Sequence, residues 1–253
     1  MMLLEQSLCM MKGVSPEAEC RLRRLGVLTC RQLADNAERF LSGAHAGRVR
    51  VSFREWEVAR AEGLVDWMIG SLPAGHRVRV LKEYWNEALF YDIETDGMSV
   101  SSGITCISAF RGGEMRSFWR GHNLEGFLAE WAKARILVSF NGKRFDTPFV
   151  CKTFGLTSVP PQIDLMDEAR YYGLRGGLKS IEQQVGFVRQ SEGCGDGRDA
   201  IRLWNEYETT KDKDVLNTLL AYNRADVASL EHLSRHLLRL SLESAQIPLD
   251  GFF

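Results

Sequence analysis

The sequence predicts an α/β domain, built on a mixed sheet flanked by helices, that follows a small domain made only of helices. Two observations support this prediction. Residues 1–70 contain helix start and stop signals. Beyond residue 85, short apolar runs rich in branched and aromatic side chains alternate with stretches of helical periodicity, as they do in α/β proteins. We therefore expect a helical domain over residues 1–70, a linker over 71–85 and the α/β domain over 86–253.

The first two helices of the N-terminal domain are marked by their capping residues. Ser15 precedes Pro16, which gives a serine cap followed by proline at the first helical position, and Gly26 ends that helix. Thr29 and Gln32 form a capping-box pattern, which predicts a second helix that reaches about residue 41.

A third helix and the linker complete this part of the chain. Ser52 and Glu55 repeat the capping-box pattern, which predicts a helix from Ser52 to about Gly70. Pro73 and Gly75 then mark the passage into the α/β domain.

The expected sheet begins with a strand at residues 88–93. The runs 104–110 and 115–119 flank the turn Arg-Gly-Gly-Glu and predict a β-hairpin, so that the three strands form an antiparallel meander. A further strand at 136–140 is expected to join this meander in parallel, through a helix at 124–134.

Two carboxylates lie on the first strand. Because side chains alternate along a strand, Asp92 and Glu94 point to the same face. Two carboxylates held together on a buried strand repel each other unless a cation neutralises them. Oxygen-only ligands of this kind suit Mg²⁺ or Mn²⁺. The alternative is a strand end at which both acids simply meet solvent.

Two further acids follow on later elements. Asp146 comes after the strand at 136–140, at the strand end where open α/β sheets gather their ligands. Asn-Gly is also an ordinary turn, however, and Asp an ordinary helix cap. Tyr222 and Asp226 lie four residues apart on a helical pattern over 215–238 and therefore share a face. A surface contact between the two is the alternative.

Taken together, these motifs resemble a known family. The order D-x-E, N-x3-F-D and Y-x3-D is similar to the three motifs of the DEDD exonucleases, in the subgroup (DEDDy) whose third motif contains tyrosine and whose domain is ribonuclease H-like. The resemblance covers residues 86–240. The segments 163–170, 178–186 and 203–207 are similar to the bacterial YprB-type group of these exonucleases.

The resemblance implies two divalent cations, Mg²⁺ or Mn²⁺, at the four acids. Asp92, Glu94 and Asp226 are expected to bind one cation, and Asp92 and Asp146 the second. Tyr222 is expected to orient the attacking water. The residues expected to contact the substrate are Thr95, Met98, Asn141 and Phe145, with core packing as the alternative for Met98.

The expected activity is that of a 3′-5′ exonuclease, which removes nucleoside 5′-monophosphates from single-stranded DNA or RNA with a free 3′ end. Two alternatives remain. One is a structure-dependent endonuclease on the same fold, and the other is a non-catalytic adaptor for nucleic acid or protein. The intact set of acids counts against the adaptor.

The N-terminal helices also resemble a known unit. The two short helices around Leu25-Gly26-Val27 are similar to a helix-hairpin-helix or SAM-like fold, whose glycine-containing turn can offer backbone N–H groups to phosphate. The first turn here is Gly13-Val14-Ser15 in place of Gly-x-Gly. Contact with nucleic acid is one open role for this domain, and a purely structural role or the docking of a protein partner is the other.

Composition limits the class of protein. The formal net charge is −1, unlike that of proteins that coat duplexes without specificity. Six cysteines without a CxxC pair predict reduced thiols in a cytoplasmic protein. A metal site formed by Cys9, Cys20 and Cys30 is the less favoured alternative. No stretch has the length of a membrane span, so no membrane partner is expected.

Overall fold

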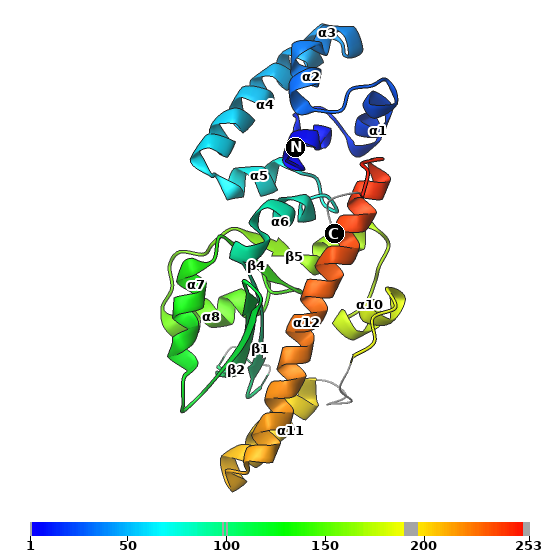
Figure 1. Ribbon diagram of the computed structural model, residues 1–253. Coiled ribbons are helices and arrows are strands. Elements are labelled where there is room, and N and C mark those ends of the chain that lie inside the picture. Colours follow the sequence, from blue (N-terminus) through cyan, green and yellow to red (C-terminus); the bar gives the residue numbers. More distant parts are fainter. Residues whose placement is uncertain (1, 98, 100, 190–196, 250–253) are drawn as a thin grey trace. The chain divides into compact units, whose positions relative to one another are not determined.

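The computed structural model describes residues 2–97, 99, 101–189 and 197–249, and the chain divides into two compact units (Figure 1). The first unit comprises residues 1–85, 168–172 and 235–253, and the second comprises 86–167 and 173–234. The expected domains differ from these units in three segments. Residues 71–85, expected as a linker, belong to the first unit and include a helix, and residues 168–172 and 235–253, expected in the α/β domain, also belong to the first unit.

The first unit is helical. It contains two 3-10 helices and six α-helices before residue 85: η1 (Leu4–Gln6), η2 (Leu8–Met10), α1 (Pro16–Arg24), α2 (Cys30–Asp35), α3 (Ala37–Phe40), α4 (Gly43–Glu62), α5 (Val65–Ser71) and α6 (Val78–Tyr84). The first two predicted caps are confirmed. The Ser15 hydroxyl accepts a hydrogen bond from the backbone nitrogen of Ala18 at 3.2 Å, and Thr29 forms a capping box with Gln32.

The third predicted helix start is wrong. Helix α4 begins at Gly43 and ends before Gly63, which has a φ of 64°. Ser52 lies inside α4, and its buried hydroxyl accepts a hydrogen bond from the backbone nitrogen of Lys12 at 3.2 Å. The Lys12 ammonium in turn pairs with Glu55 at 2.8 Å. The polar residues that look like a capping box therefore make a tertiary contact.

A buried arginine links distant parts of the first unit. Arg79 is 0% exposed and donates hydrogen bonds to both carboxylate oxygens of Glu19, at 3.1 and 3.0 Å. It also donates to the hydroxyl and carbonyl oxygens of Ser241, at 2.8 and 3.0 Å. Beside it, burial followed by the charge of Arg79 lowers the pKa of His76 to about 3, so that ring is neutral. A buried guanidinium is costly unless its donors are matched, and here they are.

The second unit is built on a five-stranded mixed sheet in the order β3-β2-β1-β4-β5. β1 (Ala88–Thr95) pairs antiparallel with β2 (Ile104–Arg111), which pairs antiparallel with β3 (Glu114–Trp119). On its other side, β1 pairs in parallel with β4 (Ile136–Ser139), which pairs in parallel with β5 (Gln162–Asp164). The predicted α/β class, the meander and the parallel strand are confirmed.

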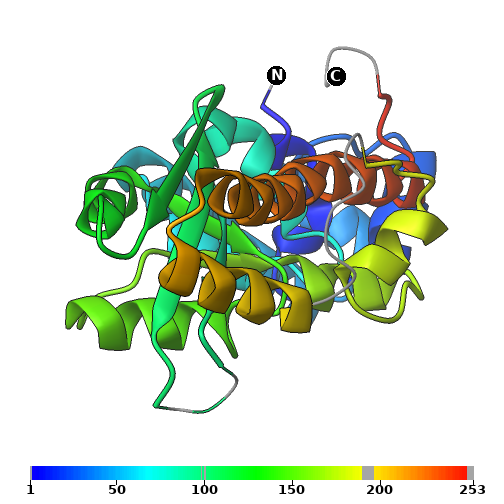
Figure 2. The ribbon, with the colours of Figure 1, turned by 90° about the horizontal axis from the view of Figure 1, so that it is seen from below.

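Helices cover both faces of this sheet (Figures 1 and 2). On one face, η4 (Leu124–Gly126), α7 (Phe127–Lys133) and α8 (Asp146–Phe154) bury the odd-numbered side chains of β1, Leu89, Tyr91 and Ile93. On the other face lie α11 (Gly197–Thr210) and α12 (Lys213–Ser244), whose core includes Trp204 and Leu219. Alternation along β1 therefore turns its even-numbered side chains toward α12.

Four elements, β5, α9 (Leu165–Tyr171), α10 (Leu178–Gln184) and α12, differ from expectation or were not predicted. β5 has three residues, too few to show an alternating pattern, although Ile163 and Asp164 in it are buried. It is followed in the chain by α9 and α10. Helix α12 is longer than the predicted 215–238 at both ends.

The sequence predicted neither a membrane-spanning segment nor, as the favoured alternative, a cysteine metal site. No helix among the described residues is long and apolar enough to cross a membrane. Their cysteines are free thiols, and in this part of the chain no group of cysteines is arranged to bind a metal ion. The thiol of Cys9 lies 3.5 Å from the Arg79 guanidinium, and that of Cys30 lies 3.5 Å from the carbonyl oxygen of Ser7. Cys194 lies outside the described residues.

Candidate metal centre

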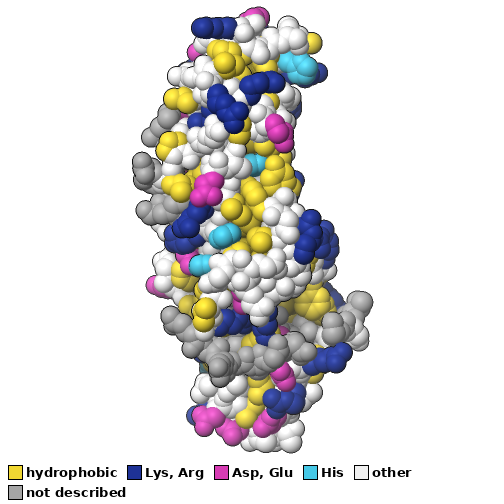
Figure 3. Space-filling model, turned by 90° about the vertical axis from the view of Figure 1, so that its right-hand side faces the viewer, with side chains coloured by type: hydrophobic (Ala, Val, Ile, Leu, Met, Phe, Trp, Pro, Cys, Tyr) yellow, Lys and Arg dark blue, Asp and Glu magenta, His cyan; other side chains and the backbone are white. Residues whose placement is uncertain are grey.

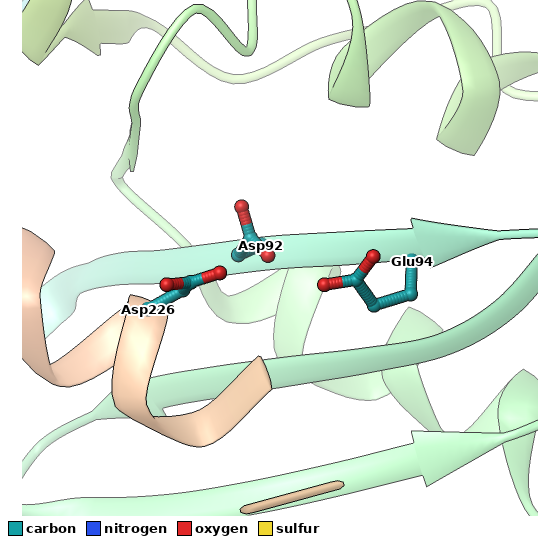
Figure 4. A group of neighbouring side chains, drawn as sticks. All are labelled: Asp92, Glu94 and Asp226. Carbon is teal, nitrogen blue, oxygen red and sulfur yellow. The ribbon is translucent and has the colours of Figure 1, made fainter. Parts of the chain in front are cut away.

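Three carboxylates of the second unit converge. Asp92, Glu94 and Asp226 each place one carboxylate oxygen within 4.8 Å of the other two. Figure 4 shows the carboxylates of Glu94 and Asp226 pointing toward each other, with Asp92 between them. The first two residues come from β1 and the third from α12, so acids far apart in the sequence form one carboxylate cluster.

A buried asparagine fixes the strand against the helix at this point. Asn223, on α12, is 0% exposed and donates a hydrogen bond from its side-chain nitrogen to Asp92 Oδ2 at 2.8 Å. The same nitrogen lies 3.3 Å from the carbonyl oxygen of Asp92. This contact orients the Asp92 carboxylate, and it brings the next turn of α12, which includes Asp226, to the same place.

Asp146 lies close to the cluster but is held differently. It is the first residue of α8 and is buried, and its Oδ1 accepts a hydrogen bond from the backbone nitrogen of Ile93 at 3.1 Å. Its carboxylate is not one of the three that meet within 4.8 Å. It is nevertheless near enough for its charge to act on Asp92.

The turn that leads to Asp146 is held by the last residue of β5. Asp164 is buried and accepts hydrogen bonds from the backbone nitrogens of Asn141, at 2.8 Å, and Lys143, at 3.3 Å. Asn141 has a left-handed φ of 60°, which asparagine tolerates better than most residues. The short strand β5 thus supports the segment that ends at Asp146.

The four acids resist being ionised together. Burial, followed by the charges of Asp146, Asp226 and Glu94, raises the pKa of Asp92 well above its usual range. Burial also raises the pKa of Glu94 to about 8 and that of Asp146 to about 7. For Asp226, burial raises the pKa and the neighbouring Arg189 opposes the rise. Burial is the main cause of all four shifts, and repulsion from neighbouring carboxylates adds to it.

The donor set fits a divalent cation. The cluster offers only carboxylate oxygens, which are the ligands that Mg²⁺ and Mn²⁺ prefer. Histidine and cysteine, the usual ligands of zinc, are not among the three residues. A cation bound there would remove the repulsion that raises the pKa values of these acids.

Tyr222 lies beside the cluster with two cationic neighbours. The Lys179 ammonium is 4.6 Å from the centre of its ring, and the guanidinium carbon of Arg189 is 6.0 Å away. Burial, followed by the charges of Asp226, Glu94 and Asp92, raises the pKa of the Tyr222 phenol above its ordinary value. The hydroxyl therefore stays protonated at neutral pH and can donate a hydrogen bond, but it is not a base.

The sequence interpretation missed three polar side chains at this site. Arg189 donates to Asp226 Oδ1 at 2.5 Å and pairs with both carboxylate oxygens of Glu182, at 2.8 and 2.6 Å. Glu182 lies in the segment 178–186, which is similar to the YprB-type exonucleases, but its partner Arg189 lies outside every motif. Asn223 follows Tyr222 directly within the third motif, which is the signal by which it could have been found.

The residues expected to contact substrate lie between Glu94 and Asp146 in the sequence. Thr95 ends β1, is buried and donates its hydroxyl to the carbonyl oxygen of Gly97 at 2.7 Å. The ring of Phe145 lies 4.8 Å from that of Phe149, at the edge of the core under α8. Asn141 is in the turn held by Asp164. Met98 lies outside the described residues. Their contacts with substrate stay predictions.

A pocket of about 560 Å³ adjoins the site and is lined by Phe187, Arg189, Ala225, Ala228 and His232, among others. Arg189 therefore lines this pocket and also contacts Asp226. On the face seen in Figure 3, basic, acidic and hydrophobic side chains are mixed, and Lys and Arg do not form one continuous basic field.

Comparisons with known proteins identify the fold of the second unit. A family model described as the RNase H superfamily matches residues 89–238. Among solved structures, the family B DNA polymerase from the hyperthermophilic archaeon Pyrobaculum calidifontis is similar, with a TM-score of 0.51 and 20% sequence identity. The similarity covers 62% of this chain and 25% of the polymerase chain, and at this identity it shows the fold alone. No curated protein sequence matches the chain.

Proposed function

The chain belongs to the ribonuclease H superfamily, and on that premise we propose that it is a metal-dependent 3′-5′ exonuclease acting on single-stranded DNA or RNA. The observation that supports this most is the convergence of Asp92, Glu94 and Asp226 beside the protonated Tyr222. Family membership supports a nuclease. The polarity of the reaction rests on the resemblance of the three motifs to those of the DEDDy exonucleases.

Each residue of the site has a proposed role. Asp92, Glu94 and Asp226 bind one divalent cation, and Asp92 and Asp146 bind a second. Two such cations, when bound, supply the activation of the attacking water and the stabilisation of the leaving oxygen. The Tyr222 hydroxyl donates a hydrogen bond that positions this water.

Thr95 directly follows Glu94 in the chain, and Asn141 and Phe145 shortly precede Asp146. These three residues and Met98 are proposed to contact the terminal nucleotide. The free thiols among the described residues fit a cytoplasmic protein. The helical first unit is proposed to have a structural role or to dock a protein partner.

Product analysis tests the proposed activity. Single-stranded DNA and RNA labelled at the 5′ end should give a ladder of progressively shorter products and nucleoside 5′-monophosphates with Mg²⁺ or Mn²⁺, and no products with a chelator. A circular single strand should resist. Cleavage of the circle would indicate an endonuclease on the same fold, and binding of nucleic acid without cleavage of any substrate would indicate an adaptor.

Two substitutions connect this activity to the cluster. Asp92→Ala and Asp226→Ala should each abolish hydrolysis while the circular dichroism spectrum stays that of the wild type. Asp214→Ala is the matched control, because Asp214 is an exposed acid in the first turn of the same helix as Asp226. Turnover by either cluster variant, or by the wild type in the presence of chelator, would contradict the metal mechanism.

A further inference from the structure

Arg189 is shared between two carboxylates. One of its terminal nitrogens donates to Asp226 Oδ1 at 2.5 Å and to Glu182 Oε1 at 2.6 Å, while its Nε donates to Glu182 Oε2 at 2.8 Å. The side chains of Arg189, Glu182 and Asp226 are only 15%, 7% and 12% exposed. Water therefore screens these contacts weakly.

The contact with Asp226 opposes cation binding at the cluster. A carboxylate oxygen that accepts a strong charge-assisted hydrogen bond has less capacity to bind a metal ion. The guanidinium also repels a divalent cation, and it does not lose its charge at any pH at which the protein is folded. Arg189 and a cation thus compete for Asp226.

The contact with Glu182 makes the exchange possible. An arginine that lost its only carboxylate partner in a poorly hydrated place would be strongly destabilising. Arg189 keeps two hydrogen bonds to Glu182 when the bond to Asp226 is broken. It can therefore release Asp226 without becoming an unpaired buried charge.

We infer that Arg189 is a positioning residue that competes with the divalent cation for Asp226, and that Glu182 holds Arg189 when Asp226 turns to the cation. This inference rests on the proposed function, because it takes the carboxylate cluster to be the cation site. Arg189 also lines the pocket of about 560 Å³.

Binding of Mn²⁺ to the full chain in the absence of nucleic acid tests the competition, with free Mn²⁺ measured by its electron paramagnetic resonance signal. Arg189→Gln should bind Mn²⁺ about tenfold more tightly than the wild type, because one positive charge at short range is removed. Arg189→Lys, which keeps the charge but not the two-pronged geometry, should fall between the two.

Glu182→Gln should have the opposite effect. With Glu182 neutral, Arg189 pairs more strongly with Asp226, so Mn²⁺ should bind more weakly than in the wild type. In the double variant this loss should disappear, because no arginine remains for Glu182 to hold. If the Glu182 effect persists without Arg189, Glu182 acts through its own charge and the role given to it here is wrong.

Arg202→Gln is the matched control for a lost arginine. Arg202 pairs with Glu206 at 3.1 Å on the exposed side of α11, in the same unit, and its loss should leave Mn²⁺ affinity unchanged. Equal or weaker Mn²⁺ binding by folded Arg189→Gln would overturn the inference and leave the proposed function standing. If Arg189→Gln does not fold, Arg189→Lys and Glu182→Gln decide in its place. Failure of the wild type to bind Mn²⁺ would overturn both.

Discussion

At the scale of single residues, the dominant feature is a set of acids whose ionisation is opposed by their surroundings. The pKa of Glu94 is raised to about 8 and that of Asp146 to about 7, with burial as the main cause. Such residues destabilise the folded chain whenever they are charged without a counterion. Three predictions follow from this property and from the protonated Tyr222 beside it.

The metal-free protein should lose stability as the pH rises. The ordinary pKa of a glutamate, which applies to Glu94 in the unfolded chain, is 4.5, and its pKa in the folded chain is about 8. Between these two pH values the folded chain therefore binds more protons than the unfolded chain. The free energy of unfolding therefore falls as the pH rises through this window. Melting temperatures measured in a chelator should fall from pH 5 to pH 8, within this range of pKa values, and Glu94→Gln should flatten the slope. An unchanged slope in that variant would contradict the assignment.

Asp92→Asn should raise the melting temperature of the metal-free protein, because it removes one of the mutually repelling charges and keeps the size of the side chain. The same substitution should reduce the rise in melting temperature that Mn²⁺ causes in the wild type. Scanning calorimetry with and without Mn²⁺ measures both effects. The exposed Asp214→Asn should change neither.

Tyr222→Phe should slow the chemical step about 10- to 100-fold, since only one hydrogen bond to the attacking water is lost. The affinities for Mn²⁺ and for single-stranded substrate in Ca²⁺ should stay near those of the wild type. Single-turnover rates measure the effect. A variant as fast as the wild type would assign Tyr222 to packing, and one that no longer binds Mn²⁺ would give it a structural role.

At the scale of elements, the sequence predicted β1 and α12 because both patterns are local. An apolar run containing Asp92 and Glu94 indicates a strand with two acids on one face, and the spacing of Tyr222 and Asp226 indicates one face of a helix. Since the strand faces the helix, these two local patterns account for most of the cluster.

Other elements could not be predicted, because tertiary contacts decide them. β5 is too short for a periodic signal, and the role of its Asp164 becomes visible only in the hydrogen bonds that it accepts from the backbone nitrogens of Asn141 and Lys143. Arg189 lies 37 residues before its partner Asp226, in a segment without regular structure. Ser52 has the local sequence pattern of a helix cap. Its hydroxyl instead accepts a hydrogen bond from the backbone nitrogen of Lys12, which is 40 residues away in the sequence.

The turn between β4 and α8 should tolerate no side chain at Gly142. A Cβ there would lie 2.1 Å from the Ser139 hydroxyl oxygen and 3.3 Å from Asp146 Oδ2. Gly142→Ala should therefore destabilise the protein by about 1–3 kcal/mol in urea unfolding and lower hydrolysis, because the overlap displaces the start of α8.

Two variants test this reading of the turn. Gly177→Ala is the matched control, because a Cβ at Gly177 would have nothing within 4 Å. Adding Ser139→Gly to Gly142→Ala should recover part of the lost stability. Equal effects of Gly142→Ala and Gly177→Ala would show that the turn has room to adjust.

At the scale of the whole molecule, the first unit raises the question of whether it contacts nucleic acid. Ser15, which stands where a second glycine would allow close approach of a phosphate, uses its hydroxyl to cap α1. We expect the unit to act through its structure or a protein partner. Neutralising the exposed Arg21 and Arg24 of α1 by Gln should then leave the salt dependence of single-strand binding unchanged.

A contact with phosphates would give a different result. Each lost contact would reduce the slope of log affinity against log salt by about 0.7 on a single strand. Point variants suit this test better than removal of residues 1–70, because the first unit also contains residues 235–253, where Leu237 and Leu242 are 0% exposed. Removal of the helices would leave such side chains uncovered.

The bonds of Arg79 have a consequence for the order in which the molecule is made. A ribosome synthesises Glu19 and Arg79 early, but Ser241, which accepts two of the hydrogen bonds from Arg79, emerges 162 residues later. All residues of the second unit are translated before it. Domains normally fold in order from the N-terminus during synthesis. Here the unit that is begun first can be completed only after the second unit has been translated. A chain that stopped before Ser241 would therefore leave two hydrogen-bond donors of the buried Arg79 without their acceptors.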